Sequence, residues 1–313
     1  MLRHGGEPQM PKNSTIGRTI ALSSLRVGFA AASAISPELA GAGAARLFLS
    51  TRRHPVPERD RAQLQSARRW QLATDQGPLA AWTWGPEEGP TIALVHGWEG
   101  RASQLGAFVP PLVAAGFRVV GLDGPGHGES PGRSSSFVAL AKALRALGDH
   151  FGPFSGAVAH SAGTVSTIYA LKQGLAVDRL VCVAPGVDLD GYAREFSRLF
   201  GLSAEVSQSL RRRTERRLGV SWEDLDPRRV PVEGRVPLLV IHDRNDREAP
   251  FSGGAALARA WGARLIATEG LGHTRILHDK TVVAQATEFL CAERVAAEAL
   301  EDRSQPVLAG VPS

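Results

Sequence analysis

Cysteine is scarce in this sequence. Its 313 residues include two cysteines, Cys182 in a short apolar run and Cys291 in a late helical pattern. Neither belongs to a metal-ligand spacing or to a dense set of cysteines that could form a disulfide framework. This scarcity excludes a small disulfide-stapled scaffold, and we expect both residues to pack as small core side chains in a reducing compartment. We therefore predict a cytoplasmic protein.

Long apolar runs are also lacking. The longest uncharged piece of the N-terminal region, residues 27–37, has 11 residues, whereas a membrane-spanning helix needs about 20. Residues 151–171 contain no Asp, Glu, Lys or Arg, but histidine, serine and glycine interrupt them. They are more typical of a strand, a turn and a helix than of a membrane span.

Positive charge is concentrated near the N-terminus. The formal net charge is +5, but residues 1–70 carry +7 and the remaining residues carry −2. A basic arm of this kind can contact anionic lipid or nucleic acid. Since nothing else in the sequence resembles a nucleic-acid module, we expect no nucleic-acid partner.

The N-terminal region also contains an apolar helical face. Leu22, Leu25 and Phe29 follow the i, i+3, i+7 spacing of one side of a helix. We expect this helix to dock on the protein core, with peripheral contact to a membrane surface as the alternative. A signal peptide for export is a further alternative, because Ala-Ser-Ala at residues 32–34 resembles a cleavage site. Arg26 shortens the apolar region and weakens that interpretation.

Short apolar segments alternate with helical patterns along most of the chain. Residues 70–74 and 79–84 flank an Asp-Gln-Gly-Pro turn and predict a β-hairpin. Further strands are expected at residues 91–96, 117–122, 156–160, 179–183, 238–242 and 263–268, and helices at 103–115, 137–151, 162–174, 253–261 and 280–298. This alternation predicts an α/β fold with a doubly wound, mostly parallel eight-stranded sheet. The carboxyl ends of its parallel strands then meet at one edge, where such sheets build their sites.

Two regions fall outside this alternation. We predict an N-terminal helical arm and linker over residues 1–60, since residues 52–61 combine two prolines with many charges. Residues 61–313 then form the main domain. Within it, about fifty residues between two prolines contain no strand pattern, which is too long for a plain loop. We predict a small helical lid over residues 186–236.

The sharpest local signal is Ala-His-Ser-Ala-Gly at residues 159–163, between a predicted strand and a predicted helix. It resembles the nucleophile elbow Gly-x-Ser-x-Gly of the α/β-hydrolases, with Ala159 in place of the first glycine. In that motif the serine lies on a strained turn, and its neighbours are small because strand and helix backbones nearly touch. The resemblance implies that Ser161 is a nucleophile and that the helix N-terminus stabilises the negative charge developing beside it.

The sequence His-Gly-Trp-Glu-Gly at residues 96–100 closes an earlier strand. In α/β-hydrolases the loop at this place supplies one backbone donor of the oxyanion hole. The resemblance therefore implies the backbone N–H groups of Trp98 and Ala162 as the two donors. The Trp98 side chain could line the substrate's acyl pocket or pack against the lid.

A glycine-rich loop at residues 123–130 resembles the Asp-x-x-Gly-x-Gly-x-Ser turn of the same family. Three glycines and a proline define a tight loop there. We interpret Asp123 and His127 as braces of this loop and not as catalytic groups.

Two later motifs supply an acid and a histidine. Asp246 stands four residues after His242 at the end of a strand, where the resemblance places the triad acid, and Asp243 is a rival interpreted as a turn residue. His273 follows the last strand in Gly-Leu-Gly-His, where the family keeps its catalytic histidine. The chain order serine, acid, histidine is also that of the α/β-hydrolases.

The sequence therefore predicts a serine hydrolase that cleaves an ester-type acyl bond of a small molecule. Ser161 attacks, His273 is the general base and Asp246 orients the histidine. We expect no cofactor and no metal. An acyltransferase with the same triad is the main alternative, and a non-catalytic binding protein on this fold is another. The sequence leaves the natural substrate and the oligomeric state open.

Overall fold

The computed structural model describes residues 12–230 and 235–304, and side chains over residues 22–230 and 235–292. The chain divides into two compact units. The larger unit contains Ser50–Asp188 and the described residues from Trp222 onward, and we call it the sheet unit. The smaller unit combines the described residues up to Leu49 with Leu189–Ser221, and we call it the helical unit.

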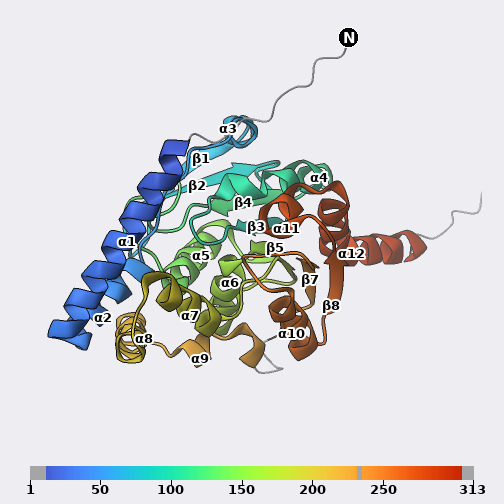
Figure 1. Ribbon diagram of the computed structural model, residues 1–313. Coiled ribbons are helices and arrows are strands. Elements are labelled where there is room, and N and C mark those ends of the chain that lie inside the picture. Colours follow the sequence, from blue (N-terminus) through green and yellow to red (C-terminus); the bar gives the residue numbers. More distant parts are fainter. Residues whose placement is uncertain (1–11, 231–234, 305–313) are drawn as a thin grey trace, which may run out of the picture. The chain divides into compact units, whose positions relative to one another are not determined.

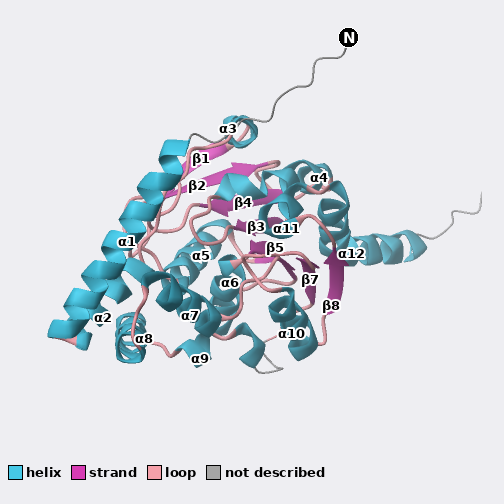
Figure 2. Cartoon of the chain, in the orientation of Figure 1, coloured by secondary structure: helices cyan, strands magenta, loops and turns pink. Residues whose placement is uncertain are grey.

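In the described part of the sheet unit, eight strands form one sheet in the order β1-β2-β4-β3-β5-β6-β7-β8 (Figure 2). β1 pairs antiparallel with β2, and β2 with β4, whereas the other neighbours are parallel. The strands are β1 (Arg68–Leu72), β2 (Leu79–Trp84), β3 (Thr91–Val95), β4 (Arg118–Leu122), β5 (Phe154–His160), β6 (Leu180–Val183), β7 (Leu238–Asp243) and β8 (Arg264–Thr268). The predicted doubly wound, mostly parallel eight-stranded sheet is confirmed.

Helices cover both faces of this sheet (Figure 1). One face packs against α5 (Phe137–Phe151), α6 (Ala162–Lys172) and α10 (Phe251–Trp261). The other packs against η1 (Ala102–Phe108), α4 (Val109–Ala114), η4 (Ile276–His278) and α12 (Lys280–Ser304). The remaining helices of this unit are α3 (Glu58–Gln65), α9 (Trp222–Leu225), η2 (Pro227–Arg229) and α11 (Gly272–Arg275). Helices on both faces bury the central strands completely, which explains why those strands are almost entirely apolar.

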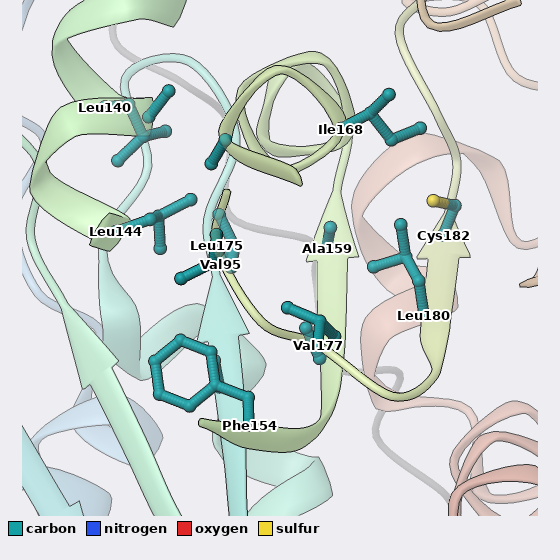
Figure 3. Packing of buried hydrophobic residues seen from close by; sticks show 14 of the residues in the cluster. Val95, Leu140, Leu144, Phe154, Ala159, Ile168, Leu175, Val177, Leu180 and Cys182 are labelled. Carbon is teal, nitrogen blue, oxygen red and sulfur yellow. The ribbon is translucent and has the colours of Figure 1, made fainter. Parts of the chain in front are cut away.

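Alternating side chains of the central strands enter two separate cores. Figure 3 shows the first, in which Leu140 and Leu144 of α5 and Ile168 of α6 lie over Val95 of β3 and Ala159 of β5. The neighbouring residues of β3 and β5 enter the second core on the opposite face. This double burial fixes the register of β5, and therefore the position of the turn that follows it.

The helical unit contains α1 (Lys12–Ile35), α2 (Pro37–Phe48), α7 (Leu189–Phe200) and α8 (Ala204–Leu218). α2 begins at Pro37, and the hydroxyl of its N-cap Ser36 accepts a hydrogen bond from the Leu39 N–H. A Cβ at Gly41 would lie 2.3 Å from Ser209 Oγ of α8. The two helices therefore approach closely only because this position has no side chain.

Aromatic contacts join the other helices of the unit. Phe29 of α1 contacts Phe200 of α7 edge-on, with ring centroids 5.9 Å apart, and Phe48 of α2 contacts Phe196 in the same way at 5.2 Å. Leu25, on the predicted apolar face, is 40% exposed. The predicted face of α1 thus makes contact within the helical unit through Phe29.

Glu38 links α2 to α8 by polar contacts. Its carboxylate accepts hydrogen bonds from Ser209 Oγ, Arg212 Nη2 and Arg213 Nη2 at 2.8, 2.7 and 3.0 Å. The Ser209 hydroxyl and the two guanidinium groups lower the pKa of Glu38 to about 2. Glu38 therefore stays ionised in the folded protein well below its ordinary pH range.

The helices expected within the predicted lid are present as α7 and α8, and both fall in the same compact unit as α1 and α2. The proposed boundaries at residues 60 and 186–236 stay a prediction, and residues 1–11, 231–234 and 305–313 lie outside the described part of the chain. None of the described helices is both long and apolar enough to cross a membrane.

Candidate functional site

Ser161 lies on the sharp turn between β5 and α6. Its φ is +51° and its ψ is −124°, a combination that non-glycine residues rarely adopt. The strain is tolerated because the turn is tightly enclosed. A Cβ at Gly163 would lie 2.6 Å from the His96 carbonyl oxygen, and one at Gly97 would lie 2.8 Å from Ser161 Cβ. These two close approaches explain why both positions near the serine are glycines.

His273 reaches Ser161 from α11, the short helix that follows β8. Its Nε2 lies 3.0 Å from Ser161 Oγ, and its Nδ1 lies 2.7 Å from Asp246 Oδ2. A neutral imidazole whose Nδ1–H donates to the carboxylate leaves Nε2 free to accept the serine proton. The structure therefore brings the three predicted residues into one chain of hydrogen bonds.

Asp246 occupies a tight turn after β7. Its Oδ1 accepts the N–H groups of Glu248 and Ala249 at 2.8 and 2.9 Å, and its Oδ2 faces His242 Nε2 at 3.3 Å as well as His273. Burial alone would raise the pKa of Asp246. The hydrogen bonds from His242, His273 and Ala249 outweigh burial and hold that pKa well below its usual range.

Asp243 has a different set of partners. Its Oδ2 accepts Thr268 Oγ1 at 2.8 Å and the Leu271 N–H at 2.9 Å, and its Oδ1 accepts the Asn245 N–H at 3.0 Å. These contacts tie the turn after β7 to the end of β8 and to the residue before α11, which contains His273. The structure places this carboxylate as a turn brace, while Asp246 is the one that meets the imidazole.

Trp98 and Ala162 occupy the positions expected for two backbone donors. Ala162 is the first residue of α6, where helix N–H groups lack partners within the helix. Trp98 follows Gly97, whose Cα faces the Ser161 side chain. Both predicted donors therefore lie in segments that adjoin Ser161, and their role as oxyanion donors stays a prediction.

His96 fixes the loop that carries Trp98. Its Nδ1 lies 2.7 Å from the Gly97 oxygen, and its Nε2 accepts the Gly124 N–H at 2.9 Å. Since the carbonyl can only accept, Nδ1 carries the proton and the ring is neutral. Complete burial, aided by the positive potential of neighbouring groups, lowers the pKa of His96 to about 3. No role was predicted for His96 from the sequence. Its position at the start of the His-Gly motif was the signal that could have indicated one.

His160 braces the catalytic histidine from the residue before the nucleophile. Its Nε2–H donates to the His273 carbonyl oxygen at 3.0 Å, and the two rings lie 4.7 Å apart. Burial first, then the neighbouring His273, lowers the pKa of His160 to about 3. This positioning role was also missed, because contact across 113 residues leaves no local pattern.

Asp123 holds the glycine-rich loop, as its motif suggested. Its two oxygens accept the N–H groups of Ala102 and Glu129 at 2.7 and 2.8 Å, and its backbone oxygen accepts Ser130 Oγ at 2.6 Å. Burial raises the pKa of Asp123 to about 6 despite these bonds.

The segment expected to be a linker is bonded to the sheet unit. Arg53 donates to the carbonyl oxygens of Gly128, Ser130 and Gly132, and the Arg52 N–H donates to Glu99 in the loop of Trp98. Prolines and charges predicted a linker here, and the structure adds that the charged Arg53 side chain binds three backbone oxygens. We call residues 50–57 the strap.

A metal site is not evident in the part of the chain that the structure describes. No group of three or more His, Cys, Asp or Glu side chains within it is arranged to hold an ion. The side chains that the structure gathers at Ser161 are those of His273 and, through it, Asp246.

Comparisons with known proteins show what this chain is similar to. Residues 92–286 match the model of the alpha/beta hydrolase family. A serine hydrolase-like protein from Dictyostelium discoideum is 30% identical over 118 residues, which are 34% of this chain and 31% of that protein. The chain thus spans about a third of the length of the curated relatives it matches.

Solved structures share the fold. Est1E from Butyrivibrio proteoclasticus, solved with ferulic acid bound, has a TM-score of 0.57 at 18% identity, over 74% of this chain and 99% of that one. An esterase from Pyrococcus furiosus has a TM-score of 0.58 at 16% identity, over 78% of this chain and 98% of that one.

Proposed function

Because the chain belongs to the alpha/beta hydrolase family, a family of hydrolase enzymes, we propose that it is a serine hydrolase acting on small-molecule esters through an acyl-serine intermediate. The observation that carries the proposal is the hydrogen-bonded series Ser161 Oγ, His273 and Asp246, with distances of 3.0 and 2.7 Å. The strained backbone of Ser161 adds to it, because such strain persists where the surrounding structure enforces it.

Acylation follows from the roles of these groups. Ser161 Oγ attacks the carbonyl carbon of the ester while His273 Nε2 takes the hydroxyl proton. The resulting imidazolium lies against the carboxylate of Asp246. The hydrogen bonds that Asp246 accepts keep this carboxylate ionised. When the tetrahedral intermediate collapses, the bond from carbon to the leaving oxygen breaks and His273 gives the proton to the departing alcohol.

Hydrolysis of the acyl-serine repeats these steps with water. His273 takes a proton from the water as its oxygen attacks the acyl carbon, and then protonates Ser161 Oγ as the acid leaves. The brace from His160 to the His273 carbonyl supports the imidazole through both halves of the reaction. This sequence of steps requires no cofactor.

Stabilisation of the oxyanion is assigned to the backbone N–H groups of Trp98 and Ala162. Backbone donors are fixed in place before the reaction, so they need no reorganisation as charge develops. The neutral His96 holds the first donor segment through Gly97. We assign the Trp98 side chain to the wall of the acyl pocket, where it packs edge-on against His127 at 5.6 Å.

A cytoplasmic location is proposed with this function. Cys182 is completely buried, and burial raises the pKa of its thiol to about 12, so it is an inert core residue. Neither of the described cysteines forms a disulfide.

The test is labelling and turnover by the intact protein. A fluorophosphonate probe is expected to label Ser161 alone, and Ser161→Ala is expected to lose both the label and the hydrolysis of p-nitrophenyl esters. Ser134→Ala, an exposed serine of the same unit, serves as the control and keeps both. Equal labelling of Ser161→Ala contradicts the proposal. Formation of new esters with added alcohols at the expense of free acid would assign the site to acyl transfer instead.

A further inference from the structure

A small cavity lies beside the nucleophile turn. Its walls include Gly97 and Trp98 of the loop after β3 and Ala162 at the start of α6. Its lining also includes His127 of the glycine-rich loop and Ser135, just before α5. Its volume of about 10 Å³ is enough for one group the size of a water molecule. The cavity therefore adjoins both of the segments to which the oxyanion donors were assigned.

Two buried polar atoms belong to this cavity's lining residues. His127 and Ser135 are 2% and 6% exposed, and neither His127 Nε2 nor Ser135 Oγ has a hydrogen-bond partner among the described residues. The other hydroxyls of the lining are occupied: Ser136 Oγ accepts the Ala139 N–H, and Ser166 Oγ donates to the Ala162 oxygen. Buried polar atoms are nearly always bonded, so this pair indicates a missing partner.

The hydrogen-bonding character of the pair can be derived. His127 Nδ1 lies 2.9 Å from the Pro125 carbonyl oxygen, so Nδ1 carries the ring proton and Nε2 presents a lone pair. Burial lowers the pKa of His127, which keeps the ring neutral. The Ser135 hydroxyl can donate or accept. A ligand hydroxyl satisfies both, by donating to Nε2 and accepting from Ser135.

We propose that this cavity is an acyl subsite that selects a short acyl group carrying a hydroxyl on the carbon next to the carbonyl. The inference rests on the proposed serine-hydrolase function. A carbonyl oxygen held by Trp98 and Ala162 leaves the adjacent carbon of the acyl group at the mouth of the cavity, and the volume admits one further oxygen. The substrate class is therefore esters of small 2-hydroxy acids, which hydrolysis releases together with the alcohol.

The test compares phenyl esters that share a leaving group and differ only in the acyl part: acetate, glycolate, methoxyacetate and butyrate. Each kcat/KM is divided by the rate at which hydroxide hydrolyses the same ester, which removes intrinsic reactivity. The wild type is expected to favour glycolate over acetate by about tenfold, the effect of two neutral hydrogen bonds. Methoxyacetate, which lacks the donor and is larger, is expected to fall below acetate.

Variants of the two polar residues identify the source of that preference. In His127→Asn the amide nitrogen can replace Nδ1 towards Pro125, but the Nε2 acceptor is lost, whereas in His127→Gln an amide atom can replace Nε2. The glycolate preference should fall about fivefold in His127→Asn and less in His127→Gln. Ser135→Ala should lower it by about threefold, and Ser134→Ala, an exposed neighbour, should leave it unchanged.

The possible outcomes distinguish a failure of the acyl subsite from a failure of the proposed serine-hydrolase function. If Ser161→Ala still hydrolyses all four esters, the proposed function is wrong. If Ser161→Ala is inactive but the wild type shows no glycolate preference, only the acyl subsite is wrong, and the cavity holds a structural water. A preference that survives both His127→Asn and Ser135→Ala also overturns the subsite, because it must then arise elsewhere.

Discussion

The sheet unit and the helical unit differ in how many polar side chains they bury and how many large apolar ones they expose. In the sheet unit, charged and polar side chains such as Asp246, His96 and His160 are buried and bonded to backbone atoms or to one another. In the helical unit the exposed side chains include large apolar ones. All five large hydrophobic side chains that are exposed in the described part of the chain belong to it: Leu25, Val27, Ile35, Leu39 and Leu199.

The two units also differ in net charge. Residues 1–49 and 189–221 contain 12 basic and 6 acidic residues, while the rest of the chain is almost neutral. When a substitution removes one member of a buried hydrogen bond, the other member is left unsatisfied, and the free energy of unfolding falls substantially. Exposed charges and partly exposed apolar groups tolerate change. Substitutions of single polar groups should therefore be severe in the sheet unit, whereas substitutions in the helical unit should be mild.

The largest effect is expected at the triad acid. Asp246→Asn removes the negative charge beside His273 and disfavours the tautomer whose Nε2 is free, so kcat should fall by about 10⁴, the loss typical of a serine protease whose triad acid is amidated. Steady-state kinetics on p-nitrophenyl acetate measure this fall. Asp243→Asn is the matched control, since it lies on the same turn but does not meet the imidazole. A larger loss of kcat in Asp243→Asn than in Asp246→Asn would reverse the assignment.

The second prediction concerns acid stability. His96 and His160 take up protons in the unfolded chain below about pH 6.5, but only near pH 3 in the folded protein. Their stabilisation is therefore complete above pH 6.5 and decreases as pH falls, by on the order of a few kcal/mol at pH 4. Asp123 acts in the opposite sense, because the folded protein binds its proton below about pH 6 and the unfolded chain only below 3.8, so it offsets part of the loss.

Urea unfolding at pH 8, 6, 5 and 4 measures this dependence. His160→Gln should make the free energy of unfolding less sensitive to pH between 6.5 and 4, while His54→Gln, an exposed histidine, should not. In the helical unit, Glu38 loses its stabilising charge only as pH falls from 4.5 towards 2. Its contribution to stability is therefore lost at lower pH than that of the buried histidines. A free energy that is constant from pH 8 to 4 would show that the buried histidines do not control acid stability.

The fold was accessible from the sequence because its signals are periodic and local. The strands and most helices follow from alternating apolar segments, and Ser161, Asp246 and His273 each follow a short motif. His160 could not be assigned in this way, since its partner is 113 residues away. The contacts of the strap were missed for a related reason: composition shows that Arg53 is charged, but not that three carbonyl oxygens converge on it.

The third prediction tests the strap. Arg53→Ala removes the donors to Gly128, Ser130 and Gly132, and should destabilise the sheet unit by about 1–3 kcal/mol. Arg52→Ala is the control, because Arg52 contributes its backbone N–H to Glu99 and that bond survives the substitution. Thermal unfolding of both variants checks the difference. If Arg53→Ala is as stable as Arg52→Ala, the bonds of Arg53 do not stabilise the fold and the strap is only a linker.

The smallest effect is expected in α1, where two apolar side chains distinguish packing from membrane contact. Phe29 contacts Phe200 and is half-buried, so Phe29→Ala should destabilise the helical unit by about 1–2 kcal/mol. Val27 is 68% exposed, so Val27→Ser should leave the free energy of unfolding unchanged within about 0.5 kcal/mol. We expect packing within the helical unit to hold α1.

Binding to phosphatidylserine vesicles should therefore be weak and should not depend on Val27. Sedimentation with such vesicles measures this binding. If Val27→Ser abolishes strong vesicle binding while Phe29→Ala is fully stable, the exposed apolar side of α1 is a membrane-contact surface, because basic residues beside an apolar face favour anionic lipid.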